Sequence, residues 1–143
     1  MRVEDILKEK GRRVITVTED VILLDALKEM KSHRIGAVLV TNSDGTVCGV
    51  LSERDVARGL PEHGASILKK PVGFLMTKKV ISCTADDTIA KIMKLMTDNR
   101  IRHLPVISKG KLGGLISIGD VVKFRIEEAE NEADALRSYI ATA

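Results

Sequence analysis

The sequence predicts a mixed α/β protein built from two tandem copies of one βαββα-like unit. Residues 14–44 align with residues 80–110 at a shift of 66, with nine identical pairs. At a shift of 65, Gly49, Ser52, Asp55 and Val56 match four further residues of the second copy. Each copy also carries the same order of β-rich and helix-like segments. A duplicated unit explains both observations.

Each copy opens with a short predicted strand, VITV (14–17) or VISC (80–83). The polar residues at 18–20 and 84–87 favour the start of a helix. Apolar stripes with helical spacing follow, comprising Leu23, Ala26, Leu27 and Met30 in the first copy and Ile89, Ile92, Met93 and Met96 in the second. Two strands around a turn come next, and Asn-Ser-Asp-Gly (42–45) is a strong hairpin signal. A second helix is expected to begin at Asp55 and at Asp120.

In chain order the expected parts are 1–65 (first copy with an N-terminal lead-in), 66–125 (second copy with its lead-in) and 126–143 (a C-terminal helix extension). The lead-ins resemble each other, since VEDIL matches VGFLM. The C-terminal helix carries a heptad seam of Val122, Ile126, Ala129, Ala133, Leu136 and Ile140. This seam either packs on the protein's own core or pairs with another subunit.

Composition excludes several classes of protein. The chain has 143 residues, 44% hydrophobic and 30% charged, with a net charge of +3 and one Tyr, two Phe and no Trp. Scattered basic residues without an aromatic platform argue against nucleic acid as a partner. No apolar run approaches the ~20 residues of a membrane span. The charged N-terminus is not a signal peptide, and Cys48 and Cys83 lack CxxC spacing, so we expect a cytoplasmic protein.

Known catalytic and metal-binding motifs are missing from the sequence, and the three histidines are isolated. We therefore expect no catalytic residue, no catalytic cofactor and no metal site.

The informative motif is Gly-h-h-Ser-x-x-Asp, where h is apolar, which occurs as GVLSERD (49–55) and GLISIGD (114–120). Its Gly permits close approach of the backbone. Its Ser and the helix amides suit a phosphate, and its Asp suits ribose hydroxyls. Alternatively, both side chains are simple N-caps.

A second motif differs between the copies: RIRHLPV (100–106) stands where the first copy has RIGAVLV (34–40). Arg102 thus replaces Gly36, and the two copies are expected to form unequal sites.

Together, these motifs and the repeat order resemble a stand-alone CBS-domain pair, also called a Bateman module. The resemblance covers almost the whole chain. It implies two CBS motifs packed about a pseudo-twofold axis, with two clefts that bind adenosyl compounds.

The resemblance also implies site residues for each cleft. In one, Asp120 holds ribose, Ser117 and Arg102 hold phosphate, and the base is surrounded by Ile15, Gly36 and Ala37. In the other, Asp55, Ser52 and Arg54 face Thr77, Ile81, Ile101 and His103. The family's usual Pro is present as Pro105, whereas the first copy has Leu39. We therefore expect the two clefts to be occupied unequally.

The resemblance thus implies a non-catalytic homodimer that binds AMP, a related adenine nucleotide or NAD and reports energy or redox status to a target protein. One alternative is a dimerisation or scaffold protein whose clefts have lost function, for which adenine nucleotides would give no thermal shift. Another is a nucleic-acid-binding CBS protein, which a steep salt dependence would identify. An enzyme with a disguised site is disfavoured because no nucleophile–base pair is visible.

Overall fold

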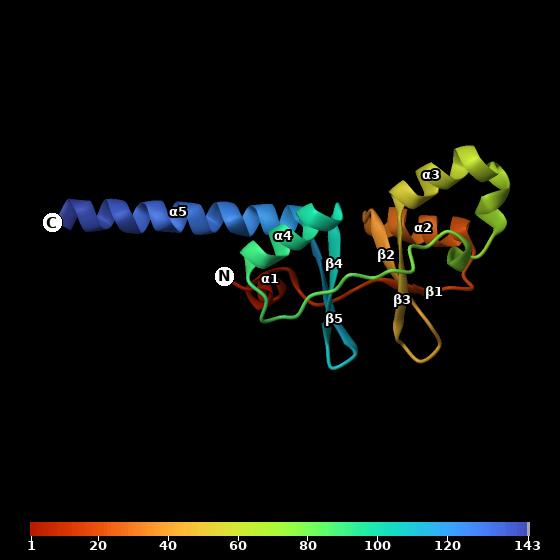
Figure 1. Ribbon diagram of the computed structural model, residues 1–143, viewed down its shortest axis with the longest axis horizontal. Helices are drawn as coiled ribbons and strands as arrows, with labels where there is room; N and C mark the ends of the chain where they lie inside the picture. The colour runs from red at the N-terminus through yellow and green to blue at the C-terminus, as the bar shows by residue number, and fades with distance from the viewer. Residues whose placement is uncertain (143) are drawn as a thin grey trace. The chain divides into compact units, whose positions relative to one another are not determined.

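A computed structural model describes residues 1–142 and confirms the mixed α/β class (Figure 1). The chain divides into two compact units. The repeat-1 unit comprises Arg13–Ile81 with Lys109–Leu112, and the repeat-2 unit comprises Met1–Arg12, Ser82–Ser108 and Gly113–Ala143. This grouping is by packing rather than by chain order, and the sequence boundaries at 65 and 125 stay a prediction. The N-terminal lead-in joins the second repeat, and the segment after residue 65 joins the first.

The repeat-1 unit contains a three-stranded sheet of order β1-β2-β3. Strands β1 and β2 are parallel, and β2 and β3 are antiparallel. The predicted turn joins β2 to β3, with Gly45 at a φ of 86° and its N–H donating to Asn42 O at 3.1 Å. The elements are β1 (Thr16–Thr18), α2 (Leu23–His33), β2 (Ala37–Thr41), β3 (Val47–Ser52), α3 (Glu53–His63), and the 3-10 helices η1 (Ala65–Lys69) and η2 (Val72–Phe74).

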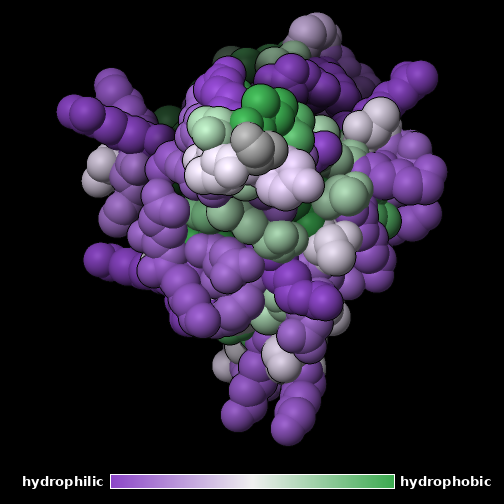
Figure 2. Space-filling view, turned by 90° about the vertical axis from the view of Figure 1, so that its left-hand side faces the viewer, coloured by the Kyte–Doolittle hydropathy of each residue, from purple (hydrophilic) through white to green (hydrophobic). Residues whose placement is uncertain are grey.

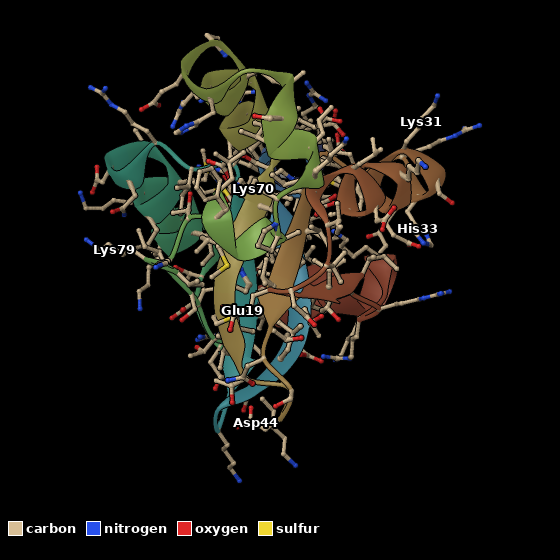
Figure 3. The ribbon with its side chains drawn as sticks, turned by 90° about the vertical axis from the view of Figure 1, so that its right-hand side faces the viewer. Glu19, Lys31, His33, Asp44, Lys70 and Lys79 are labelled. Atoms are coloured by element: carbon tan, nitrogen blue, oxygen red, sulfur yellow. The ribbon has the colours of Figure 1, made fainter. Side chains whose placement is uncertain are left out.

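The core of this unit is aliphatic, as the near-absence of aromatics requires. Leu23, Ala26 and Met30 of α2 are buried against Val38 and Val40 of the sheet. This arrangement confirms the predicted apolar stripe. Charged side chains occupy the other surfaces: Figure 3 shows Lys31 and His33 of α2 and Asp44 of the β2–β3 turn pointing away from the sheet.

Helix starts in both repeats lie elsewhere than the sequence suggested. Helix α2 begins at Leu23, because Thr18 and Asp20 form a turn in which Val21 N–H donates to Thr18 O at 3.2 Å. In the second repeat, Thr88 caps its helix by accepting from Lys91 N–H at 3.2 Å. The helices expected at Asp55 and Asp120 begin two residues earlier, at Glu53 and Ile118. Each Asp therefore lies inside the first helical turn.

The repeat-2 unit contains a two-stranded sheet, β4-β5. The strand expected at 80–83 is reduced to one parallel bridge between Cys83 and Val106. Cys83 N–H donates to Pro105 O at 3.0 Å, and Ile107 N–H donates to Cys83 O at 2.9 Å. The elements are α1 (Val3–Lys10), α4 (Ile89–Asn99), β4 (His103–Ser108), β5 (Lys111–Ser117) and α5 (Ile118–Thr142). The C-terminal extension expected at 126–143 continues the same helix, α5, as far as Thr142.

Both lead-ins pack against the glycine that opens the Gly-h-h-Ser-x-x-Asp motif. A Cβ on Gly49 would lie 2.6 Å from Met76 Sδ, and one on Gly114 would lie 2.5 Å from Leu7 Cδ2. Gly is required where another group approaches this closely. Leu7 and Met76 are thus structural equivalents, which confirms the resemblance between the lead-ins.

Candidate functional site

The Ser and Asp of each motif lie at a strand-to-helix corner. In the first corner, Ser52 Oγ accepts from Asp55 N–H at 3.2 Å, while Asp55 Oδ2 accepts from Ser52 N–H at 2.9 Å. In the second, Ser117 Oγ accepts from Asp120 N–H at 3.2 Å, and Asp120 Oδ2 accepts from Ser117 N–H at 2.9 Å. This reciprocal pattern is a capping box. Both side chains therefore cap their helix, the Ser from the N-cap position and the Asp from three residues further along, and the same contacts hold each carboxylate in one orientation.

The first corner gathers five of the residues that the sequence singled out. Ala37 pairs with Ser52 across the antiparallel strands, and Gly36 O accepts from the N–H of Glu53 at 3.0 Å. Thr77 Oγ1 donates to Asp55 Oδ1 at 3.3 Å. The hydrogen bonds to the half-buried Asp55 carboxylate thus come from neutral groups, while Glu53 Oε2 lies near Gly36 on the same corner.

The second corner has the same backbone geometry, since Arg102 O accepts from Ile118 N–H at 2.8 Å. Its chemistry differs because a lysine reaches it. Lys10 Nζ lies 2.6 Å from Asp120 Oδ2 and donates to Leu115 O at 2.9 Å. The two side chains are 36% and 23% exposed, so the pair is partly shielded from water. Sequence reasoning did not identify Lys10, because no motif or periodicity links the lead-in to this corner.

Lys10 takes the place that Thr77 has in the first corner. Thr77 donates through its hydroxyl to Asp55 and through its backbone N–H to Val50 O at 2.9 Å. Lys10 serves the equivalent acceptors, Asp120 and Leu115 O, with a single ammonium group. The first corner thus has neutral donors where the second has a cation.

The charges of the second corner shift its titratable groups. Burial acts to raise the pKa of Asp120, but the hydrogen bonds from Lys10 and Ser117 outweigh it, so this pKa lies below its ordinary value of 3.8. Burial lowers the pKa of His103, and the nearby Lys10 and Arg102 charges add to that effect against the opposing charge of Asp120. At neutral pH the corner therefore holds an ionised carboxylate beside an uncharged imidazole.

The other predicted residues occupy varied environments. Arg54 and Arg102 are exposed, Pro105 is buried in β4, and half-buried positions are held by Ile15, Ile81 and Ile101. The pairing of residues from opposite repeats into one cleft stays a prediction. Within residues 1–142, no group of three His, Cys, Asp or Glu side chains is arranged to hold a metal ion. No helix in the same range is long and apolar enough to cross a membrane.

Comparison with known proteins gives a consistent result. The profile described as CBS domain matches residues 3–62 and 72–127, more than half of the chain. The Arabidopsis thaliana protein named "CBS domain-containing protein CBSX3, mitochondrial" is 36% identical, with 96% of this chain and 71% of the plant protein covered. A longer Arabidopsis protein, CBSCBSPB5, is 27% identical, and the chain spans only 24% of its length.

Solved structures have the same fold. The CBS-domain containing protein ATU1752 from Agrobacterium tumefaciens matches with a TM-score of 0.85 and 45% identity, covering 87% of this chain and 99% of that one. The CBS domain pair of protein MJ0100, in complex with 5′-methylthioadenosine and S-adenosyl-L-methionine, matches with a TM-score of 0.77 and 22% identity, covering 87% and 98%. The second likeness concerns the fold alone.

Proposed function

Because the chain belongs to the CBS-domain family, we propose that it is a non-catalytic regulatory module that binds an adenine nucleotide and signals to a target protein. The observation that carries this proposal is the Ser–Asp corner built twice with the same hydrogen bonds. A carboxylate fixed in this way is preorganised to accept hydrogen bonds from two ribose hydroxyls. The complex of MJ0100 with adenosyl compounds supports the same ligand class.

The second corner fits a ligand with a phosphate. Ser117 and the start of α5 offer a hydroxyl and a helix N-terminus, and Lys10 and Arg102 bring positive charge to the same unit. Charge-assisted bonds from such groups favour phosphate oxygens over neutral ligands. We therefore favour AMP, with ADP, ATP and NAD as related candidates. The first corner offers Ser52 and Thr77 without a lysine, so weaker phosphate binding is expected there.

Calorimetric titration of the whole chain with AMP, ADP, ATP, NAD and S-adenosyl-L-methionine tests the proposal. Asp120→Asn and Asp55→Asn are the matched variants, because Asn keeps an oxygen that accepts the Ser N–H. Asp120→Ala is less clean, since loss of the cap alone costs about 1 kcal/mol of stability. We expect each Asn variant to weaken binding at its own corner by about tenfold or more, from the lost charge-assisted hydrogen bonds. Unchanged affinity in both variants, or no binding at millimolar nucleotide, would refute the proposal.

The proposal includes a homodimer in the cytoplasm. Cys48 and Cys83 are both free, and the absence of a disulfide between them suits a reducing compartment. A dimerisation or scaffold protein is the second candidate, favoured by the exposed apolar residues of α5. It predicts a dimer whose melting temperature does not change with nucleotide.

A further inference from the structure

The distal part of α5 is exposed over most of its length. Near its start, Val121 and Phe124 are buried, and the N-terminal amine of Met1 pairs with Glu128 at 2.8 Å. Beyond Glu128 the helix continues to Thr142 past α1 and α4 of the same unit (Figure 1). These last turns therefore present an exposed helix surface on which a partner could pack.

An apolar stripe runs along the exposed helix. Leu136 and Ile140 are 59% and 66% exposed, and Val122 and Ile126 are 45% and 53% exposed. Figure 2 looks onto the end of α5 and shows a hydrophobic patch on one side of it, with hydrophilic side chains around. With Ala129 and Ala133 the stripe keeps the alternating spacing of a two-stranded coiled coil, with d positions at Val122, Ala129 and Leu136 and a positions at Ile126, Ala133 and Ile140.

The charged residues beside the stripe indicate which partner helix can cover it. Arg125 and Glu132 stand at g positions, and Glu130 and Arg137 stand at e positions. In a parallel two-stranded coil, each g residue faces the e residue five positions later on the other helix. Arg125 then meets Glu130 of the second copy, and Glu132 meets Arg137 of the second copy. Every such pair is of opposite charge, and twofold symmetry forms each pair twice.

An antiparallel pair of the same length has the opposite result. There the e residues face e residues and the g residues face g residues, with position 131 at the centre. Glu130 then meets Glu130 of the second copy, Glu132 meets Glu132, and Lys123 meets Arg137. All three contacts join like charges, so charge complementarity selects the parallel arrangement.

We propose that the distal half of α5 pairs with α5 of a second copy in a parallel, in-register coiled coil. The proposal specifies the homodimer suggested above and does not depend on nucleotide binding. The ion pair within the distal half of the helix does not oppose it, because Arg137 and Asp134 (3.2 Å) are both exposed, and Arg125 remains 51% exposed beside Glu128. Such pairs are weak and exchange readily.

Sedimentation of the full chain without nucleotide tests the interface. We expect the wild-type chain to be dimeric at tens of micromolar and Leu136→Glu to be monomeric there. Ser138→Glu is the matched control, because it adds the same charge at an f position on the far side of the helix, and it should stay dimeric. A wild-type chain that is monomeric throughout, or a Leu136→Glu variant that remains dimeric, overturns the proposal. Nucleotide titration of the same samples shows separately whether the binding function fails.

A charge exchange tests the register. Glu132→Arg places like charges opposite each other twice, and the dimer dissociation constant should rise roughly tenfold. Adding Arg137→Glu should restore the wild-type value in a parallel dimer. Failure of the double variant to recover contradicts the parallel register.

A crosslink tests the orientation. In the parallel dimer, Ile140→Cys faces its own copy and should form an intermolecular disulfide when oxidised glutathione accepts the electrons of the two thiols. In the antiparallel dimer the two positions would be about 27 Å apart along the helix axis, since each residue rises 1.5 Å. The wild-type chain, with only Cys48 and Cys83, is the control and should remain uncrosslinked. A dimer of Ile140→Cys that does not crosslink refutes the parallel orientation.

Discussion

The Lys10–Asp120 pair can be tested by replacing Lys10 with Met, which keeps most of the apolar stem and removes the charge. The pair spans 2.6 Å and is only partly exposed, and Lys10 also bonds to Leu115 O. Exposed ion pairs contribute about 0.2–1 kcal/mol to the free energy of unfolding. The partial shielding and second bond place this pair at the upper end, so Lys10→Met should lower the free energy of unfolding by about 1 kcal/mol at pH 7. Urea unfolding measures this difference.

The pH dependence of the free energy of unfolding distinguishes the ion pair from apolar packing of the Lys10 side chain. The pKa of Asp120 is lower in the folded protein than its ordinary 3.8, so the folded state favours the ionised carboxylate. The resulting stabilisation is complete above the unfolded-state pKa and is lost as the pH falls through the folded-state value. The difference between wild type and Lys10→Met should therefore be constant near neutrality and shrink below pH 3.8. Carboxyl NMR titration should also show a higher Asp120 pKa in the variant.

The same variant tests the role of Lys10 toward ligands. Removing the ammonium group leaves Asp120 Oδ2 with the Ser117 N–H as its remaining donor and removes a cation that attracts phosphate. AMP affinity should fall relative to adenosine affinity by about tenfold, the value of one charge-assisted bond. Lys8→Met, two residues away at an exposed position on a different side of α1, is the control and should leave the ratio unchanged. An unaltered AMP-to-adenosine ratio, with an unaltered Asp120 pKa, would refute the assigned role of Lys10.

Three further predictions concern stability and reactivity. Gly114→Ala should destabilise the fold by about 1–3 kcal/mol in urea unfolding, because its Cβ would lie 2.5 Å from the buried Leu7 side chain; wild-type stability would contradict this steric argument. Arg100→Gly should raise stability by about 0.5–1 kcal/mol, since Arg100 ends α4 at a φ of 53°, and a lowered melting temperature would speak against it. Cys83, buried with a pKa of about 12, should react with a thiol reagent at pH 8 far more slowly than the half-buried Cys48, and equal rates would show that the core opens.

Much of the fold could be predicted from the sequence because duplication doubles each signal. The apolar stripes of α2 and α4, the Asn42–Gly45 turn and the Ser–Asp motifs were all found as predicted. The predicted first residues of the helices were less accurate, because Thr, Asp and Glu are common in turns as well as at helix N-caps. At 18–20 the turn formed and the helix began later, at Leu23. In the Ser–Asp motif the Ser took the cap position and the Asp lay three residues further along.

The division into units and the role of Lys10 could not be predicted, for a shared physical reason. Both depend on which sheet a lead-in packs against. The local sequence pattern carries no information about contacts between residues that are more than a hundred positions apart in the chain. The similarity of VEDIL to VGFLM indicated that the lead-ins are equivalent. It did not indicate that α1 would pack with residues from the second repeat, where Lys10 lies beside Asp120.

The difference between the two corners arises from the lead-ins as much as from the motif strands. Leu7 and Met76 make equivalent contacts, but the chain continues differently after each. After Met76 the backbone bridges to Val50 and leaves the short Thr77 side chain at Asp55. After Leu7 the helix continues to Lys10, whose longer side chain reaches Asp120 from the next turn. The extended helix thus brings the Lys10 ammonium group to Asp120, a contact with no counterpart at Asp55. We therefore expect that replacing residues 72–79 by the sequence of residues 3–10 strengthens AMP binding relative to adenosine at the first corner, and an unchanged ratio would contradict this origin of the asymmetry.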